Sequence, residues 1–196
     1  MNEKTARIVR IIFAPPICAG TMLSILWIVN KNYFLNLSHY LLAMFFLFLL
    51  PLLAYPISLI GKRKRKDNRT FQRNLAIIFS VLGYVLGFAF CLIFDTTKTE
   101  FLFYGTYFFS GLFIFTTSFI FKFKASGHSC SLSGPIIFLS FVVSPFCLFG
   151  YLLLLPNFAS ALTLKRHTTS QLAIGMFIPV LSLYLAYFSS YLFYAF

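Results

Sequence analysis

Two histidines, His128 and His167, are the residues of this chain whose type and position best suit chemistry. Each stands in a polar turn at the edge of an apolar segment: His128 comes after Ser126 and Gly127, and His167 comes directly after Arg166. Imidazole titrates near neutral pH, so it can act as a nucleophile, a general acid or a general base. The pair therefore indicates a reaction centre at the ends of apolar segments.

A third polar element lies upstream, at residues 62–73. It carries one acidic residue, Asp67, and seven cations: Lys62, Arg63, Lys64, Arg65, Lys66, Arg69 and Arg73. Fixed positive charge is what proteins use to hold the oxygens of a phosphate group. Histidines and clustered cations together indicate phosphate chemistry. For the four cations at 63–66, a simple role in membrane topology is the competing interpretation.

The composition predicts an integral membrane protein. Hydrophobic residues make up 60% of the 196 residues, aromatic residues 20% and charged residues only 10%, which is too apolar for one soluble core. The length predicts a single domain, residues 1–196. The net charge of +12 is concentrated in a few polar turns rather than on a basic face, so we expect a bilayer and not nucleic acid as the partner.

The hydropathy pattern predicts an all-α, polytopic membrane helix bundle with six to seven hydrophobic segments. We expect them near 8–29, 39–60, 74–94, 101–121, 129–143, 147–164 and 168–193. The fifth and sixth are predicted because residues 129–164 hold no charge, and one helix of that length would extend about 54 Å against a hydrocarbon core of about 30 Å. Ser144, Pro145 and Gly150 supply the break, so we expect a fold-back near 144–150.

The fold-back decides on which side of the membrane His167 emerges. With it, His167 lies on the same side as His128 and the 62–73 turn. All but two of the 16 Lys and Arg residues then fall on that side, the exceptions being Lys31 and Lys98. The positive-inside rule accordingly predicts a multi-pass protein whose site faces the cytoplasm.

The order of these motifs resembles the type-2 phosphatidic acid phosphatase superfamily of membrane lipid phosphatases, whose pattern is KxxxxxxRP, then PSGH, then SRxxxxxHxxxD. Lys62 and Arg69 have the spacing of the first motif, with Thr70 in place of its proline. Residues 125–128 read ASGH and match the second motif except for its proline. The resemblance covers roughly residues 62–175.

The third motif is the most altered. Ser160 and His167 fit its frame, whereas Ala161 stands at the arginine position and Gln171 at the aspartate position. An arginine fork binds two phosphate oxygens at once, and a lysine does not fully replace it. Gln171 lies one helical turn after His167, where its side chain can accept a hydrogen bond from the ring but adds no negative charge.

The resemblance implies a phosphatase or pyrophosphatase acting on a phosphorylated lipid, with no metal and no other cofactor. His167 would attack phosphorus to form a phosphohistidine, and His128 would protonate the leaving oxygen. The residues implied to bind phosphate are Lys62, Arg69, Ser126 and Gly127, with Gln171 and Arg166 in support. The identity of the lipid and the oligomeric state are not specified by these motifs.

Two other functional classes remain open at this stage. The first is a catalytically inactive phosphatase-like protein that binds anionic lipids or serves as a scaffold. The second is a transporter, although the predicted spans hold almost no ionisable groups of the kind an ion-coupled carrier needs. His39 precedes the second span with no evident partner in the sequence, so we expect it to cap or to lie at the interface rather than to react.

Overall fold

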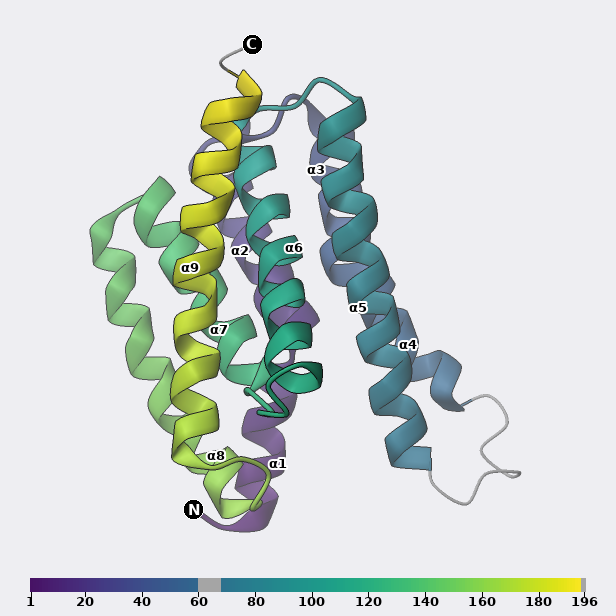
Figure 1. Ribbon diagram of the computed structural model, residues 1–196, viewed down its shortest axis with the longest axis vertical. Helices are drawn as coiled ribbons and strands as arrows, with labels where there is room; N and C mark the ends of the chain where they lie inside the picture. The colour runs from purple at the N-terminus through teal and green to yellow at the C-terminus, as the bar shows by residue number, and fades with distance from the viewer. Residues whose placement is uncertain (60–67, 195–196) are drawn as a thin grey trace.

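The computed structural model describes residues 1–59 and 68–194, and these residues form helices joined by short turns. In chain order the elements are α1 (Glu3–Ile12), α2 (Pro15–Val29), the 3-10 helix η1 (Lys31–Tyr33), α3 (Leu37–Met44), the π-helical turn η2 (Phe45–Leu49), α4 (Leu50–Leu59), α5 (Asn68–Ile93), α6 (Lys98–Phe119), α7 (Gly127–Val142), the 3-10 helix η4 (Pro145–Leu153), α8 (Leu154–Thr163) and α9 (Thr169–Tyr194) (Figure 1). The predicted all-α class is confirmed.

The helices have the length and hydropathy of membrane spans. Within the described residues, five stretches are long and apolar enough to cross a bilayer: Leu37–Ser58, Phe71–Ile93, Lys98–Phe119, Pro145–Thr163 and Thr169–Tyr194. A sixth results if α1 and α2, which meet at a bend of 44°, count as one span. α7 is apolar but shorter. The chain is therefore a multi-pass, polytopic membrane bundle, as the hydropathy pattern predicted.

The predicted fold-back is present between α7 and η4. α7 ends at Val142, Ser144 caps the next element, and η4 begins at Pro145, whose missing N–H suits the first turn of a helix. η4 then packs back against α7. Gly150, expected to help break the chain, lies inside η4. A Cβ there would come within 3.1 Å of Ile136 on α7, so its small size permits the two segments to pack closely.

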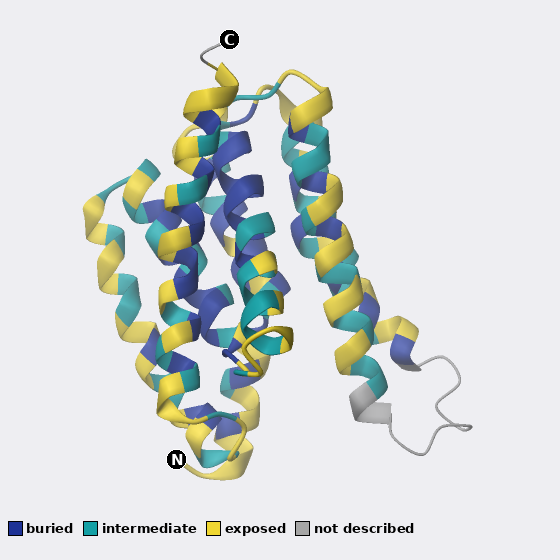
Figure 2. Cartoon of the chain, viewed as in Figure 1, coloured by how far each residue is buried: buried dark blue, intermediate teal, exposed yellow. Residues whose placement is uncertain are grey.

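The core lies where α2, α6, α7 and α9 face one another, and the exposed residues lie on the outer faces (Figure 2). Large rings fill this core, among them Phe101, Phe103, Tyr104 and Phe138. Apolar side chains also cover the outside, with Phe146 on η4 78% exposed. An apolar exterior of this kind is what a bilayer solvates. The polar site must therefore lie at an end of the bundle.

The two ends of the bundle differ in what they hold. The end that carries the N-terminus, the α6–α7 turn and the α8–α9 turn holds His128 and His167, and we call it the histidine end (Figure 1). The opposite end carries the α5–α6 turn and the end of α9. Lys31 and Lys98, the two exceptions in the charge count, lie in elements of this opposite end. The fold-back thus places both histidines at one end.

The third histidine lies at the opposite end and has a partner, contrary to expectation. His39 Nδ1 lies 2.8 Å from Oε1 of Glu100, whose side chain is 1% exposed. The other carboxylate oxygen of Glu100 accepts the backbone amides of Thr97 and Leu35, at 2.6 and 3.3 Å. A buried carboxylate needs such donors. His39 therefore joins α3 to α6, and it is no part of the site.

Candidate active site

The turn before α7 positions His128. The side-chain oxygen of Ser126 caps the helix by accepting the backbone amide of Ser129 at 3.3 Å, and Ser126 is fully buried. α7 begins at Gly127, so His128 stands in the first helical turn and remains partly exposed. Backbone amides in a first turn lack partners within the helix, and they carry partial positive charge. His128 is thus held where an anion is favoured.

A Schellman turn at the end of α8 positions His167. The amide of Arg166 donates to the Ala161 carbonyl and that of Lys165 to the Leu162 carbonyl, both at 3.0 Å. Lys165 has a φ of 50°, in the left-handed region that glycine normally occupies at this place. The chain reverses there, and His167 follows at once, partly exposed, before α9 begins.

The first two turns of α9 hold the two histidine turns together. The amide of Ser126 donates to the backbone carbonyl of Gln171 at 2.9 Å. One turn later, Gly175 packs against the backbone of Ser126 so closely that a Cβ at this position would collide with the Ser126 carbonyl oxygen. Only a residue without a side chain allows this approach. Sequence reasoning did not single out Gly175, because glycine is common in membrane helices.

Hydrogen bonding assigns the tautomer of His167. Gln171 Oε1 lies 3.2 Å from the backbone nitrogen of Thr168 and 3.1 Å from His167 Nδ1. A backbone N–H can only donate, so the Gln171 atom is the amide oxygen, and Nδ1 must carry the proton that it accepts. In the neutral ring the lone pair then lies on Nε2. The contact predicted between Gln171 and His167 is confirmed.

His128 has the opposite tautomer because of a residue that sequence reasoning counted only as a topology determinant. Nη2 of Arg10, on α1, lies 3.2 Å from His128 Nδ1. Guanidinium only donates, so Nδ1 of His128 is the acceptor, and the ring is neutral with its proton on Nε2. Arg10 is only 9% exposed. Its contact with His128 joins α1 to the start of α7.

Burial and nearby cations act on the protonation of His167. Its pKa is lowered from the usual 6.5, first by partial burial and then by the charges of Arg10 and Lys124. Hydrogen bonds to Gln171 and to the backbone of Lys124 oppose this shift without cancelling it. Burial, and after it the charges of Arg10 and His167, lower the pKa of His128 to about 3. The four groups therefore form one electrostatic site whose His167 is neutral at pH 7.

Asn157 is a buried residue that contacts the backbone of His128. It lies in α8, is fully buried, and donates from Nδ2 to the His128 carbonyl at 3.4 Å. The backbone carbonyl of Asn157 accepts a hydrogen bond from the hydroxyl of Ser160 at 2.7 Å. Ser160, which fits the third motif, is therefore a buried helix residue that faces protein.

Some residues expected at the site remain predictions or change role. Lys62 lies outside the described residues, and only the backbone of Arg69 is described, in the first turn of α5. In Figure 1 the first turn of α5 is drawn at the lower right, and α8 is drawn at the lower left. Gly127 and Arg166 are exposed beside the histidines. Ser126 was expected to bind phosphate, but its amide is bonded to Gln171 and its hydroxyl caps α7, so we assign it to positioning.

Comparison with known families, curated proteins and solved structures finds no match to this chain. The fold defines an all-helical, multi-pass membrane protein. At one end it carries two histidines of opposite tautomer with buried and exposed cations beside them.

Proposed function

We propose that the protein is a membrane lipid phosphate phosphatase or pyrophosphatase that works without a metal ion. The observation that carries the proposal is the tautomer of His167. Its Nδ1–H is bound to Gln171, so the lone pair of the neutral ring lies on Nε2, and burial together with the charges of Arg10 and Lys124 lowers its pKa. A neutral imidazole beside fixed positive charge is suited to attack an anionic phosphoryl group.

The first half of the reaction uses both histidines. The lone pair on Nε2 of His167 attacks phosphorus, and the bond from phosphorus to the leaving oxygen breaks with its electron pair going to that oxygen. His128, whose Nδ1 takes a proton from solvent once the substrate is bound, gives its Nε2 proton to the leaving oxygen. The products are a phosphohistidine and the lipid alcohol, or the lipid phosphate when the substrate is a diphosphate.

The second half returns the enzyme to its starting state. Nε2 of neutral His128 accepts a proton from water as the water oxygen attacks phosphorus. The P–N bond breaks, its electrons return to Nε2 of His167, inorganic phosphate leaves, and His128 gives its Nδ1 proton back to solvent. The charges of Arg10 and Lys124 and the amides at the start of α7 stabilise the negative charge that develops on the phosphoryl oxygens. Lys62 and Arg69 remain proposed ligands of the same group.

The position of the site fits a lipid substrate. The histidines lie at an end of a bundle whose sides are covered by exposed apolar residues. A lipid chain can therefore stay in the bilayer while its phosphate enters the histidine end. Because the positive-inside rule puts the cation-rich end in the cytoplasm, we place the site on that side.

The test is release of inorganic phosphate by detergent-purified protein from phosphatidate, phosphatidylglycerophosphate and a polyprenyl diphosphate, with a chelator present. We expect release by the parent and none by His167→Ala. His128→Ala should lose at least about 100-fold, the usual worth of a positioned acid. His39→Ala is the control, with release compared per folded molecule, because this histidine lies at the opposite end. Absence of release from every lipid would overturn the proposal in favour of an inactive, lipid-binding protein.

A further inference from the structure

We propose that Arg10 of α1 binds the phosphoryl group of the substrate and supplies the arginine that position 161 lacks. This inference rests on the proposed function and names a further residue of the same site. It is not suggested by the motif pattern, which begins at residue 62, some fifty residues after α1 ends.

The orientation of α1 brings Arg10 into the site. Ala6 and Arg10, one turn apart, are the buried residues of this helix, so they share the face that it turns toward protein. That face packs mainly against α8, the helix that carries Ala161. Ala6 and Ala161 are both 0% exposed, as expected where two helices pack closely. The guanidinium of Arg10 then reaches His128 on α7.

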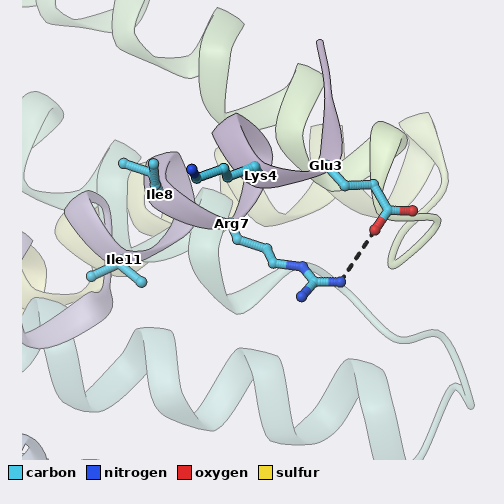
Figure 3. A pocket seen from close by; sticks show the side chains of 5 residues that line it. All are labelled: Glu3, Lys4, Arg7, Ile8 and Ile11. Atoms are coloured by element: carbon cyan, nitrogen blue, oxygen red, sulfur yellow. Dashed lines mark hydrogen bonds and ion pairs between the residues drawn. The ribbon is translucent and has the colours of Figure 1, made fainter.

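Arg7 lies one turn earlier on the same helix and carries the same charge, but it does not enter the site. The position of Arg10 on the buried face of α1 therefore brings it to His128. The side chain of Arg7 is 69% exposed and pairs with Glu3 at 3.1 Å (Figure 3). Together with Lys4, Ile8 and Ile11 these two residues line a surface hollow of about 400 Å³ that does not include Arg10. Arg7 is thus a matched control with the same charge and a different face.

The contact between Arg10 and His128 can be exchanged for a contact between Arg10 and the phosphate of the substrate. Guanidinium has five N–H donors in a planar fork, and the contact with Nδ1 of His128 uses Nη2. While that contact stands, His128 is neutral and a poor acid. A phosphate anion draws the fork to its oxygens, because charge-assisted hydrogen bonds are stronger than one to a neutral ring. Nδ1 of His128 is then free to take the proton that makes His128 an acid.

The experiment compares Arg10→Gln, Arg10→Lys and the control Arg7→Gln by phosphate release and by calorimetric binding of orthovanadate, an anion that resembles the phosphoryl group. We expect Arg10→Gln to lose about 100-fold in kcat/KM, the usual effect of removing one preorganised donor, and to bind vanadate more weakly. Arg10→Lys keeps the charge without the fork and should fall in between. Arg7→Gln should stay within about threefold of the parent, since exposed pairs contribute little.

The two readouts separate this inference from the proposed function. If the parent releases phosphate and Arg10→Gln does so equally well, the role of Arg10 is refuted and the phosphatase stands. If no variant releases phosphate but vanadate binding still depends on Arg10 and not on Arg7, the role of Arg10 in phosphate binding is supported. The proposed hydrolase activity is then refuted. Should Arg10→Gln fail to fold, Arg10→Lys decides: equal turnover and equal vanadate affinity to the parent would overturn the inference.

Discussion

The amide oxygen of Gln171 lies 3.1 Å from Nδ1 of His167 while it also accepts the backbone amide of Thr168 at 3.2 Å. Because one oxygen serves both donors, the ring of His167 is fixed in orientation and in tautomer. A neutral amide does this without adding the negative charge that a carboxylate would bring. The consequence is a nucleophile that is well oriented and whose pKa is not raised by a carboxylate.

Replacing Gln171 by Glu tests this arrangement. Glutamate keeps the acceptor in the same place and adds a negative charge, so it should raise the pKa of His167. The low-pH limb of kcat/KM is then expected to move to higher pH. Gln171→Leu, which removes the acceptor, should instead lower kcat/KM by roughly 100-fold or more through loss of the tautomer. Equal pH profiles for the parent and Gln171→Glu would show that the contact does not set the protonation of His167.

The parent enzyme should remain active below the ordinary pKa of histidine. The nucleophile is neutral His167, and its pKa lies below 6.5 because of burial, Arg10 and Lys124. Activity should therefore persist as pH falls through 6.5 and disappear only as pH falls through the lowered pKa. Lys124→Gln removes one of the lowering charges, while Gln171 and the Lys124 backbone still contact the ring, so the low-pH limb should move up. A parent whose activity already halves at or above pH 6.5 contradicts this electrostatic assignment.

Gly175→Ala should damage the site from within α9. An alanine Cβ would meet the carbonyl oxygen of Ser126, which is backbone and cannot rotate away, so the turn before His128 must shift. We expect lower turnover and a lower melting temperature. The control is Gly134→Ala in α7, whose Cβ would have its nearest neighbour at 3.8 Å, on Pro179. There the gain in helix propensity, about 1 kcal/mol, is opposed because Gly134 directly precedes Pro135, so we expect little change in melting temperature. Similar melting temperatures for the two variants would argue against the close approach at Gly175.

Lys165→Gly should raise stability. Lys165 has a φ of 50°, which costs an L-residue about 1–2 kcal/mol relative to glycine. The chain-entropy cost of glycine offsets part of this, so the expected net gain is about 0.5–1 kcal/mol, read as a higher melting temperature. Lys165→Ala removes the same charge but keeps the Cβ, and it should show no such gain. A gain of equal size in both variants would attribute the effect to charge.

His39→Leu should lower stability and leave the chemistry intact. The substitution removes the ring partner of Oε1 of Glu100, which is fully buried, and leaving a buried acceptor without its partner costs about 1–3 kcal/mol. We expect a markedly lower melting temperature with phosphate release per folded molecule unchanged. Glu100→Gln in the same background removes the orphaned charge and should recover part of the loss. A fall in turnover at temperatures where the variant is folded would bring His39 back into the site.

Local patterns in the amino-acid sequence were sufficient to predict the spans and the fold-back. Twenty or so apolar residues must form a helix in a bilayer, and the stretch 129–164 is too long to cross once, so the break at Ser144 and Pro145 follows from length and backbone chemistry. The proximity of His128 to His167 follows in turn, because the fold-back returns the chain to the same end. The contact from Gln171 to His167 is equally local, one helical turn apart.

The tertiary structure alone decided which other groups complete the site. Arg10 and His128 are separated by 118 positions, and nothing in the pattern of α1 distinguishes Arg10 from Arg7 until the buried face of that helix is known. Gly175 looks like any glycine of an apolar helix until its contact with Ser126 is seen. The partner of His39 lies on another span. Hydropathy and turn chemistry act over a few residues, so they determine the helices and the end of the bundle at which each turn lies. Helix packing brings distant residues into contact, and it decided which residues make up the site.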